Sequence, residues 1–283
     1  MTRRVAGALL GLFFFAAIVV PAQGQETLSE RLRALDARVV PEREARQKQL
    51  DRMLERDVRA RVHAAHRHWA DAWEAIRTRA DWERFRDARL KFLRESLGPF
   101  PAVAKVPKVQ VSGTLRGDGY TIEKLVYAAR PGLPVAANLY LPEKPPRSMP
   151  GLVVCHSFFH PKSQPELQDL GVNGARAGWA VLVLDLLGHG ERRQHPFVDA
   201  KSHPGRFNPA RQDYYFRANL GAQLDLAGES LMGWMAWDVM RGVDVLRAWP
   251  DVDREKVLVL GAVAAGGDVA AVAAALDERI SAV

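Results

Sequence analysis

The sequence predicts an α/β fold: a mostly parallel sheet with an antiparallel start, helices on both faces and an N-terminal helical extension. Two alternating runs around an Asp-Gly turn predict the antiparallel start, and three short, wholly apolar runs predict buried parallel strands. With 283 residues, 48% hydrophobic and 26% charged, the chain has enough apolar residues for a large core. We predict four regions: a signal peptide (1–24), a helical region (25–97), a linker (98–108) and a partial α/β domain (109–283).

Residues 1–24 have the pattern of a cleavable secretory signal. The basic segment "MTRR" precedes the apolar run "VAGALLGLFFFAAIVV", and "PAQG" offers a cleavage point after Gly24. We therefore expect a secreted or periplasmic protein. The alternative is an uncleaved membrane anchor, because the apolar run is shorter than the roughly 20 residues that a spanning helix needs.

The helical region carries many of the arginines that give the chain its net charge of +7. In "DWERFRDARLKFLRE" they alternate with acidic residues at helical spacing, which favours a solvated helix face. No basic, aromatic-studded motif indicates nucleic-acid binding, so we expect no nucleic-acid partner. A basic surface could favour an acidic plant polysaccharide.

The strand signals begin after the Pro-rich linker "GPFPAVAKVPK". The runs "VQVSGTL" and "YTIEKLVYAA" flank "RGDG" and predict a hairpin, and "LPVAANLYLP" predicts a third strand. The apolar runs "GLVVC", "AVLVLD" and "KVLVLG" are typical of parallel strands. Between the first two, "GVNGARAGWA" has the small residues of a helix that packs tightly on a sheet.

Several ordered blocks carry a resemblance to a known family. They are "GDGYTIEKLVY", "RPGLPVAANLYLP", "VVCHS", "GWAVLVLDLLGHGER", "GESLMGWMAWDVMRGVDVL" and "DVDREKVLVLG". From about Trp82 to Ile280 the chain resembles the bacterial acetyl xylan esterase-like branch of the α/β-hydrolase superfamily. The resemblance implies an α/β-hydrolase fold, a serine acyl-enzyme mechanism on acylated carbohydrate, acetylated plant polysaccharide as partner, and no cofactor.

The resemblance also implies where substrate would lie. In such hydrolases the loop after "VVCHS" presents a backbone N–H to the oxyanion, which makes His156 and Ser157 candidates for the oxyanion or substrate pocket. Asp185 and His189 in "LDLLGHGER" follow the next strand. A brace between loops, through Arg192 or Arg193, is the alternative to direct substrate contact.

The stretch "VLVLGAVAAGGDVAAVAAALDERI" predicts the strand, turn and helix on which hydrolases mount their nucleophile. One register places the nucleophile at Val263 and the other places it at Ala264, with Ala265 next as a pocket candidate. Positive φ is costlier for a β-branched residue, so sterics favour Ala264. Neither side chain can attack an ester, and the predicted catalytic set is empty.

Other candidate groups are predicted to be structural. Ser230 in "GESLMG" enters a helix without a preceding strand, and the single cysteine, Cys155, lies in an apolar run. His156, His160, His189, His195 and His203 gather in loops without the spacing of a metal site, so no metal is expected.

The last residues before Val283 predict the start of another strand. In this fold the triad acid and histidine follow the nucleophile on later loops, so we expect a C-terminally truncated product without them. The edge of "KVLVLG" would then stay open for a partner chain. The function that follows is an impaired secreted esterase, with a carbohydrate-binding pseudoenzyme or a partner-completed fragment as the alternatives.

Overall fold

The computed structural model describes residues 27–35, 50–102, 106–157, 161–194 and 208–283, with residues 199, 201 and 205. Its contacts group the chain into two units, Met1–Asp71 and Ala72–Val283. The predicted signal peptide lies outside the described residues. Among the described helices, none has the length and apolar character needed to cross a membrane.

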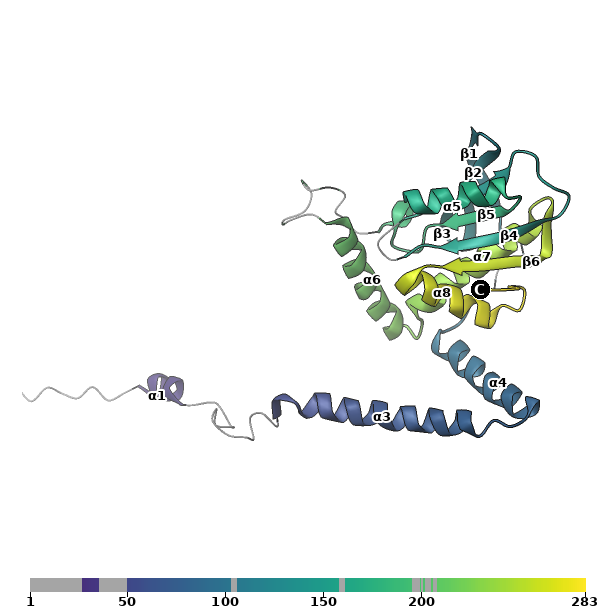
Figure 1. The fold of residues 1–283 in the computed structure, drawn as a ribbon. Helices are drawn as coiled ribbons and strands as arrows, with labels where there is room; N and C mark the ends of the chain where they lie inside the picture. Colours follow the sequence, from purple (N-terminus) through teal and green to yellow (C-terminus); the bar gives the residue numbers. More distant parts are fainter. Residues whose placement is uncertain are drawn as a thin grey trace, which may run out of the picture. The chain divides into compact units, whose positions relative to one another are not determined.

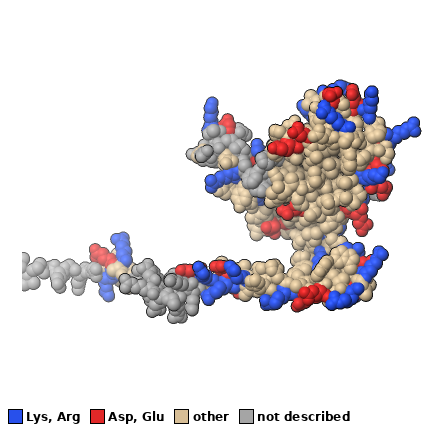
Figure 2. All heavy atoms as spheres, in the orientation of Figure 1, with Lys and Arg blue, Asp and Glu red and all other residues tan. Residues whose placement is uncertain are grey.

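The expected helices before the sheet are present in the described part of the chain. They are α1 (Leu28–Ala34), α3 (Met53–Glu74) and α4 (Arg79–Ser96), and none contains a buried residue. Thr78 and Asp81 form a capping box at the beginning of α4. Figure 2 shows basic and acidic side chains interleaved along α3 and α4, which agrees with a solvated, ion-paired face.

The sheet is mixed, as predicted, and has the order β1-β2-β3-β5-β4-β6 (Figure 1). The pairs β1–β2, β2–β3 and β3–β5 are antiparallel, and β5–β4 and β4–β6 are parallel. The antiparallel part therefore extends one pairing beyond the predicted three-strand start. The bounds are β1 (Val109–Gly117), β2 (Tyr120–Arg130), β3 (Leu133–Pro142), β4 (Met149–Cys155), β5 (Ala180–Leu184) and β6 (Val252–Gly261).

Helices cover both faces of the sheet (Figure 1). Helix α5 (Pro165–Arg176) packs on one face against Val181 and Val183 of β5. On the other face, α7 (Leu231–Ala248) and α8 (Val263–Leu276) pack against Leu182 and Leu184. Helix α6 (Pro209–Leu226) and the short 3-10 helix η1 (Gly190–Arg192) follow β5.

Glycines set the close approach of α5 to the sheet. A Cβ on Gly171 would lie 2.5 Å from the ring of Tyr140, and one on Gly174 would lie 2.6 Å from Val181. No side chain fits at those distances, so the small residues of "GVNGARAGWA" serve the packing that the sequence predicts.

A short segment begins another strand beside β6. Leu258 forms a parallel bridge with Ala282, Ser281 donates its N–H to the Val257 carbonyl at 2.8 Å, and Val259 donates to the Ala282 carbonyl at 3.0 Å. The predicted strand start before Val283 is confirmed.

A buried ion pair ties the loop after β5 to α7. Arg192 Nη1 donates to Asp238 Oδ2 at 2.7 Å and to the Asp185 carbonyl oxygen at 3.1 Å. Both side chains are nearly inaccessible to solvent. Burial raises the pKa of Asp238, and the charge of Arg192 opposes that rise.

Replacing Arg192 with Leu should lower the free energy of unfolding by about 3–5 kcal/mol, because the Asp238 carboxylate would stay buried without its bound cation. The matched control is Arg79→Leu, which removes an exposed ion pair with Glu83 and should change stability by less than about 0.5 kcal/mol. Urea unfolding measures both. Equal small losses in the two variants would contradict the assigned role of Arg192.

Candidate functional site

The turn from β6 into α8 has the geometry of a strained elbow. Strand β6 ends at Gly261, and Ala262 precedes the helix. Val263 has a φ of 53° and Ala265 a φ of 71° with a ψ of −58°, so two residues with side chains adopt positive φ within three positions. Such conformations cost about 1–3 kcal/mol each and persist only where the surrounding packing imposes them.

The packing that imposes this turn is the contact of α8 with the ends of β4 and β6. A Cβ on Gly266 would lie 2.6 Å from the carbonyl oxygens of both Cys155 and His156, and one on Gly261 would lie 2.2 Å from the Gly266 carbonyl oxygen. Gly267 has its nearest such neighbour at 3.9 Å. The glycines of "GAVAAGG" are expected to let helix and strand approach closely; the approach depends on Gly261 and Gly266, and Gly267 does not take part.

The steric argument that favoured Ala264 is wrong. Ala264 has a φ of −57° and a ψ of 144°, an ordinary extended conformation, while the β-branched Val263 adopts the positive φ. Val263 is 76% exposed, but exposure does not remove the cost of its positive φ, because that cost comes from contacts of its own Cβ with the adjacent backbone. Neither register places a hydroxyl, thiol or carboxylate on the turn between Ala262 and Gly266.

The Asp268 carboxylate accepts a hydrogen bond from the backbone N–H of Ala265, the residue after Ala264. Ala265 donates its N–H to Asp268 Oδ2 at 3.2 Å, from the first turn of α8. If Ala264 is the nucleophile position, this N–H would face the oxyanion, whereas with Val263 in that position the Ala264 N–H would do so. Here it binds a group of the same charge as an oxyanion.

His156 lies buried at the end of β4. Its Nδ1 contacts the Ser157 carbonyl oxygen at 2.5 Å, and its Nε2 accepts the N–H of Leu186 at 2.9 Å. This pattern fits one neutral tautomer, with the proton on Nδ1. Burial lowers the pKa of His156 to about 4, and the neighbouring His189, whose ring centre lies 4.9 Å away, acts in the same direction.

Asp185, at the end of β5, joins two loops. Its Oδ1 accepts the N–H of Lys162 at 2.8 Å, its Oδ2 contacts Lys162 Nζ at 2.6 Å, and Oδ2 also accepts the N–H of Glu191 at 3.1 Å. Asp185 is fully buried. It therefore joins the two loops, with Lys162 as its cation. The arginines expected to pair with a carboxylate do so: Arg192 pairs with Asp238 and Arg193 with Asp213.

Glycines shape the loop that carries His189. Gly188 and Gly190 have φ values of 86° and 52°, and a Cβ on Gly190 would lie 2.3 Å from the Asp185 carboxylate. Glycine is the residue that adopts such φ values without strain, so these two positions allow the tight path of the loop.

The structure brings His156, Asp185 and His189 together beside the elbow, all buried, while Ser157 and Ala265 are half-buried and Ala264 is exposed. Burial raises the pKa of the Cys155 thiol to about 12, which suits an inert residue. His160, His195 and His203 lie outside the described residues. Within the part of the chain that the structure describes, no group of His, Cys, Asp or Glu could hold a metal ion.

Two residues of this region escaped the sequence analysis. Asp268 could have been found, since an acidic residue three positions after the turn can reach back to a free N–H. Lys162 offered no signal, because its partner Asp185 lies 23 positions away and only the fold joins them.

A protein-family model identifies the family to which this chain is related. The acetyl xylan esterase (AXE1) family model matches residues 115–283, more than half of the sequence. The chain belongs to the acetyl xylan esterase family. A search of curated proteins finds no match.

Solved structures share the fold with this acetyl xylan esterase family member. A Bacteroides fragilis protein with a provisional acetyl xylan esterase assignment is 15% identical, with a TM-score of 0.57 over 71% of this chain and 52% of its own. A methylesterase is 18% identical, with a TM-score of 0.56 over 75% and 42%. An acetyl xylan esterase from Paenibacillus sp. R4 is 25% identical, with a TM-score of 0.45 over 72% and 58%. The chain spans about half the length of these structures.

Two neighbouring glycines of the family member test the packing of the elbow. Gly266→Ala should lower the free energy of unfolding by about 1–3 kcal/mol, because its Cβ would meet two backbone carbonyls that cannot move aside. Gly267→Ala is the control and should raise stability by about 0.4–1 kcal/mol, since its helical position has room. Urea unfolding compares them, and a tolerated Gly266→Ala would show that the contact is not tight.

Acid should weaken the fold through His156. Burial keeps the pKa of His156 at about 4 in the folded state, whereas in the unfolded chain the imidazole takes up a proton near its ordinary pKa of 6.5. The contribution is therefore fully present above pH 6.5 and is lost as pH falls from 6.5 to 4, by up to about 3 kcal/mol. In urea unfolding at several pH values, His156→Gln should be less stable and show a shallower pH dependence. Parallel wild-type and variant curves would contradict this role.

Proposed function

We propose that this chain is a non-hydrolytic member of the acetyl xylan esterase family. The observation that carries the proposal is the elbow: Val263, Ala264 and Ala265 follow the end of β6, and none bears an attacking group. Serine esterases need an oxygen nucleophile at this turn, and activation by a neighbouring base has no effect without one.

Two buried groups beside the turn, Cys155 and His156, are poorly placed to replace the missing nucleophile. Cys155 is fully buried at the end of β4, and burial holds its pKa near 12, so the thiolate is rare at neutral pH. His156 is also fully buried, with both ring nitrogens engaged by backbone groups. Each would need its surroundings to open before it could meet an ester.

The hydrogen bond from Ala265 to Asp268 supports the same proposal. An oxyanion hole stabilises developing negative charge with donors that are free to receive it. The Ala265 N–H instead faces a carboxylate, whose charge would oppose a tetrahedral oxyanion. The elbow thus lacks the attacking atom in either register, and in the Ala264 register it also disfavours the charge that an attack would create.

The family relationship supports acetylated plant polysaccharide as the ligand class, bound without cleavage. The apolar run within residues 1–24 supports export to the periplasm or beyond, with an uncleaved anchor as the alternative. A non-hydrolytic, exported member of this family would then act by holding acetylated carbohydrate.

The purified protein should hydrolyse p-nitrophenyl acetate no faster than its Ala264→Gly variant. The methyl group that this substitution removes supplies no chemistry, so the two rates should agree and lie near the background of an unrelated protein. Rates of both proteins more than about tenfold above that background would refute the proposal, because they would show hydrolysis by a group of this chain other than the Ala264 methyl. Circular dichroism checks that both proteins are folded.

A further inference from the structure

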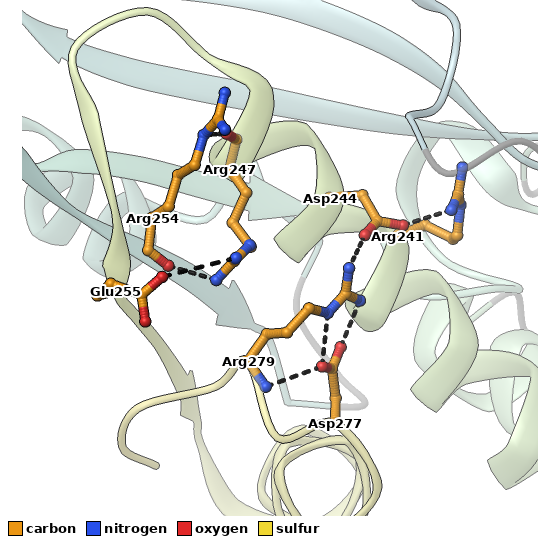
Figure 3. Close-up of polar contacts among 7 residues, drawn as sticks. All are labelled: Arg241, Asp244, Arg247, Arg254, Glu255, Asp277 and Arg279. Carbon is orange, nitrogen blue, oxygen red and sulfur yellow. Dashed lines mark hydrogen bonds and ion pairs between the residues drawn. The ribbon is translucent and has the colours of Figure 1, made fainter.

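A pocket of about 450 Å³ lies at the opposite end of β6 from the elbow. Val106, Asp244, Arg247, Ala248, Arg254 and Arg279 line it. Figure 3 shows that its charged side chains come from α7, from the beginning of β6 and from the segment after α8. Arg254 and Gly261 are separated by about 23 Å along the strand, so the pocket and the elbow are distinct places.

The acidic groups of the pocket are already neutralised. Asp244 binds Arg241 through one carboxylate oxygen and Arg279 through the other. Asp277 holds Arg279 through two parallel hydrogen bonds of 2.7 Å. These four side chains form a network of two cations and two anions (Figure 3).

Arg247 and Arg254, the other two arginines of the pocket, are not held in such a network of close ion pairs. Arg247 Nη1 donates to the Arg254 carbonyl oxygen, and Arg254 Nε donates to the Arg247 carbonyl oxygen at 3.0 Å, so the two side chains cross. The one carboxylate near them is Glu255, whose oxygen lies 3.8 Å from Arg247 and whose side chain is 86% exposed. Arg254 has no ion-pair partner among the described residues.

The crossed pair therefore presents positive charge to the pocket, with one long, exposed ion pair from Arg247 to Glu255 as its compensation among the described residues. Hydrogen bonds to each other's backbone carbonyls fix Arg247 and Arg254 without neutralising them, which leaves the remaining guanidinium donors for an anion. A planar guanidinium matches a carboxylate with two parallel hydrogen bonds. Held in advance, the two arginines lose little side-chain entropy when an anion binds.

The size of the pocket limits the class of anion. A single water molecule accounts for about 30 Å³, so a bare carboxylate would leave most of the space unfilled. The apolar surfaces of Val106 and Ala248 offer contacts to a larger body. The pocket is at the small end of the roughly 300–1,000 Å³ that small-molecule sites occupy, which suits a single sugar ring or two.

We propose that the pocket between Arg247, Arg254 and Arg279 binds the carboxylate of an acidic sugar, a uronate. The charge on the ligand follows from the arginines, and the choice of a sugar rests on the proposed function of the chain. The site lies away from the elbow. It would recognise uronate units of a polysaccharide whose acetylated units bind at the elbow end.

Calorimetric titration of the purified chain tests the proposal with four probes: sodium glucuronate, glucose, inorganic phosphate and a xylo-oligosaccharide that carries a glucuronate branch. Glucuronate and the branched oligosaccharide should bind, glucose should not, and phosphate should bind more weakly. The double variant Arg247→Gln/Arg254→Gln should weaken glucuronate binding at least tenfold, or about 1.4 kcal/mol. Added salt should weaken the wild-type interaction.

The control variant is Arg147→Gln, at an exposed loop position, which removes the charge of one arginine outside the pocket. It should leave glucuronate affinity within twofold of wild type. Equal binding of glucuronate and glucose, or an unchanged affinity in a folded double variant, would overturn the anion site. Phosphate bound as tightly as glucuronate would overturn the assignment to a sugar acid.

These outcomes are separate from those of the proposed function. Ester hydrolysis at the elbow would refute the non-hydrolytic proposal and leave a glucuronate titration unchanged. A neutral acetylated xylo-oligosaccharide that binds equally to wild type and to the double variant would show that the elbow end acts independently of the pocket.

Discussion

The close contact between the beginning of α8 and the end of β4 is the constraint on which this end of the molecule depends. Gly266 lies where a Cβ would be 2.6 Å from two backbone carbonyl oxygens, and Gly261 is equally crowded by Gly266. A strand can pass into a helix at that distance only through a sharp turn. The backbone makes this sharp turn by adopting positive φ values at Val263 and Ala265.

That constraint separates the architecture of the elbow from its chemistry. The geometry comes from glycines that lie on either side of the turn, so the residues at its apex can change without changing the path of the chain. Ala264 is exposed and extended, and nothing in its packing requires a serine. An esterase scaffold can therefore keep its elbow without an attacking oxygen. In this chain the Ala265 N–H of the turn is hydrogen-bonded to the Asp268 carboxylate.

Buried polar contacts hold the neighbouring loops in a similar way. Asp185 joins Lys162 to the loop after β5, and Arg192 joins the same loop to Asp238 of α7. Each carboxylate is buried and each has a cation within hydrogen-bond distance, which is the condition under which buried charges are tolerated. His156 adds a neutral imidazole between two backbone groups. These contacts account for the burial of residues that the family resemblance suggested as pocket candidates.

Local patterns predicted most of the fold, and failed where distant residues meet. Apolar runs and the small residues of the α5 segment predicted the strands and the tight helix, because period and side-chain size are visible in sequence. The pairing of Asp185 with Lys162 was not predicted, since a contact across 23 positions leaves no local trace. The choice of Ala264 over Val263 by sterics failed because the close contacts of Gly261 and Gly266 fix the path of the turn and impose a positive φ on Val263 in spite of its local cost. The arginine pocket was not predicted for the same reason: α7, β6 and the segment after α8, which carry its charged residues, meet only in the fold.

Covalent labelling with a fluorophosphonate probe is the most direct test of an elbow without a nucleophile. The account predicts no saturable adduct on the native protein at neutral pH when its peptides are mapped by mass spectrometry, whereas an active serine esterase treated in parallel is labelled at its catalytic serine. A stoichiometric adduct on one side chain of this polypeptide, lost when the protein is unfolded before labelling, would contradict it.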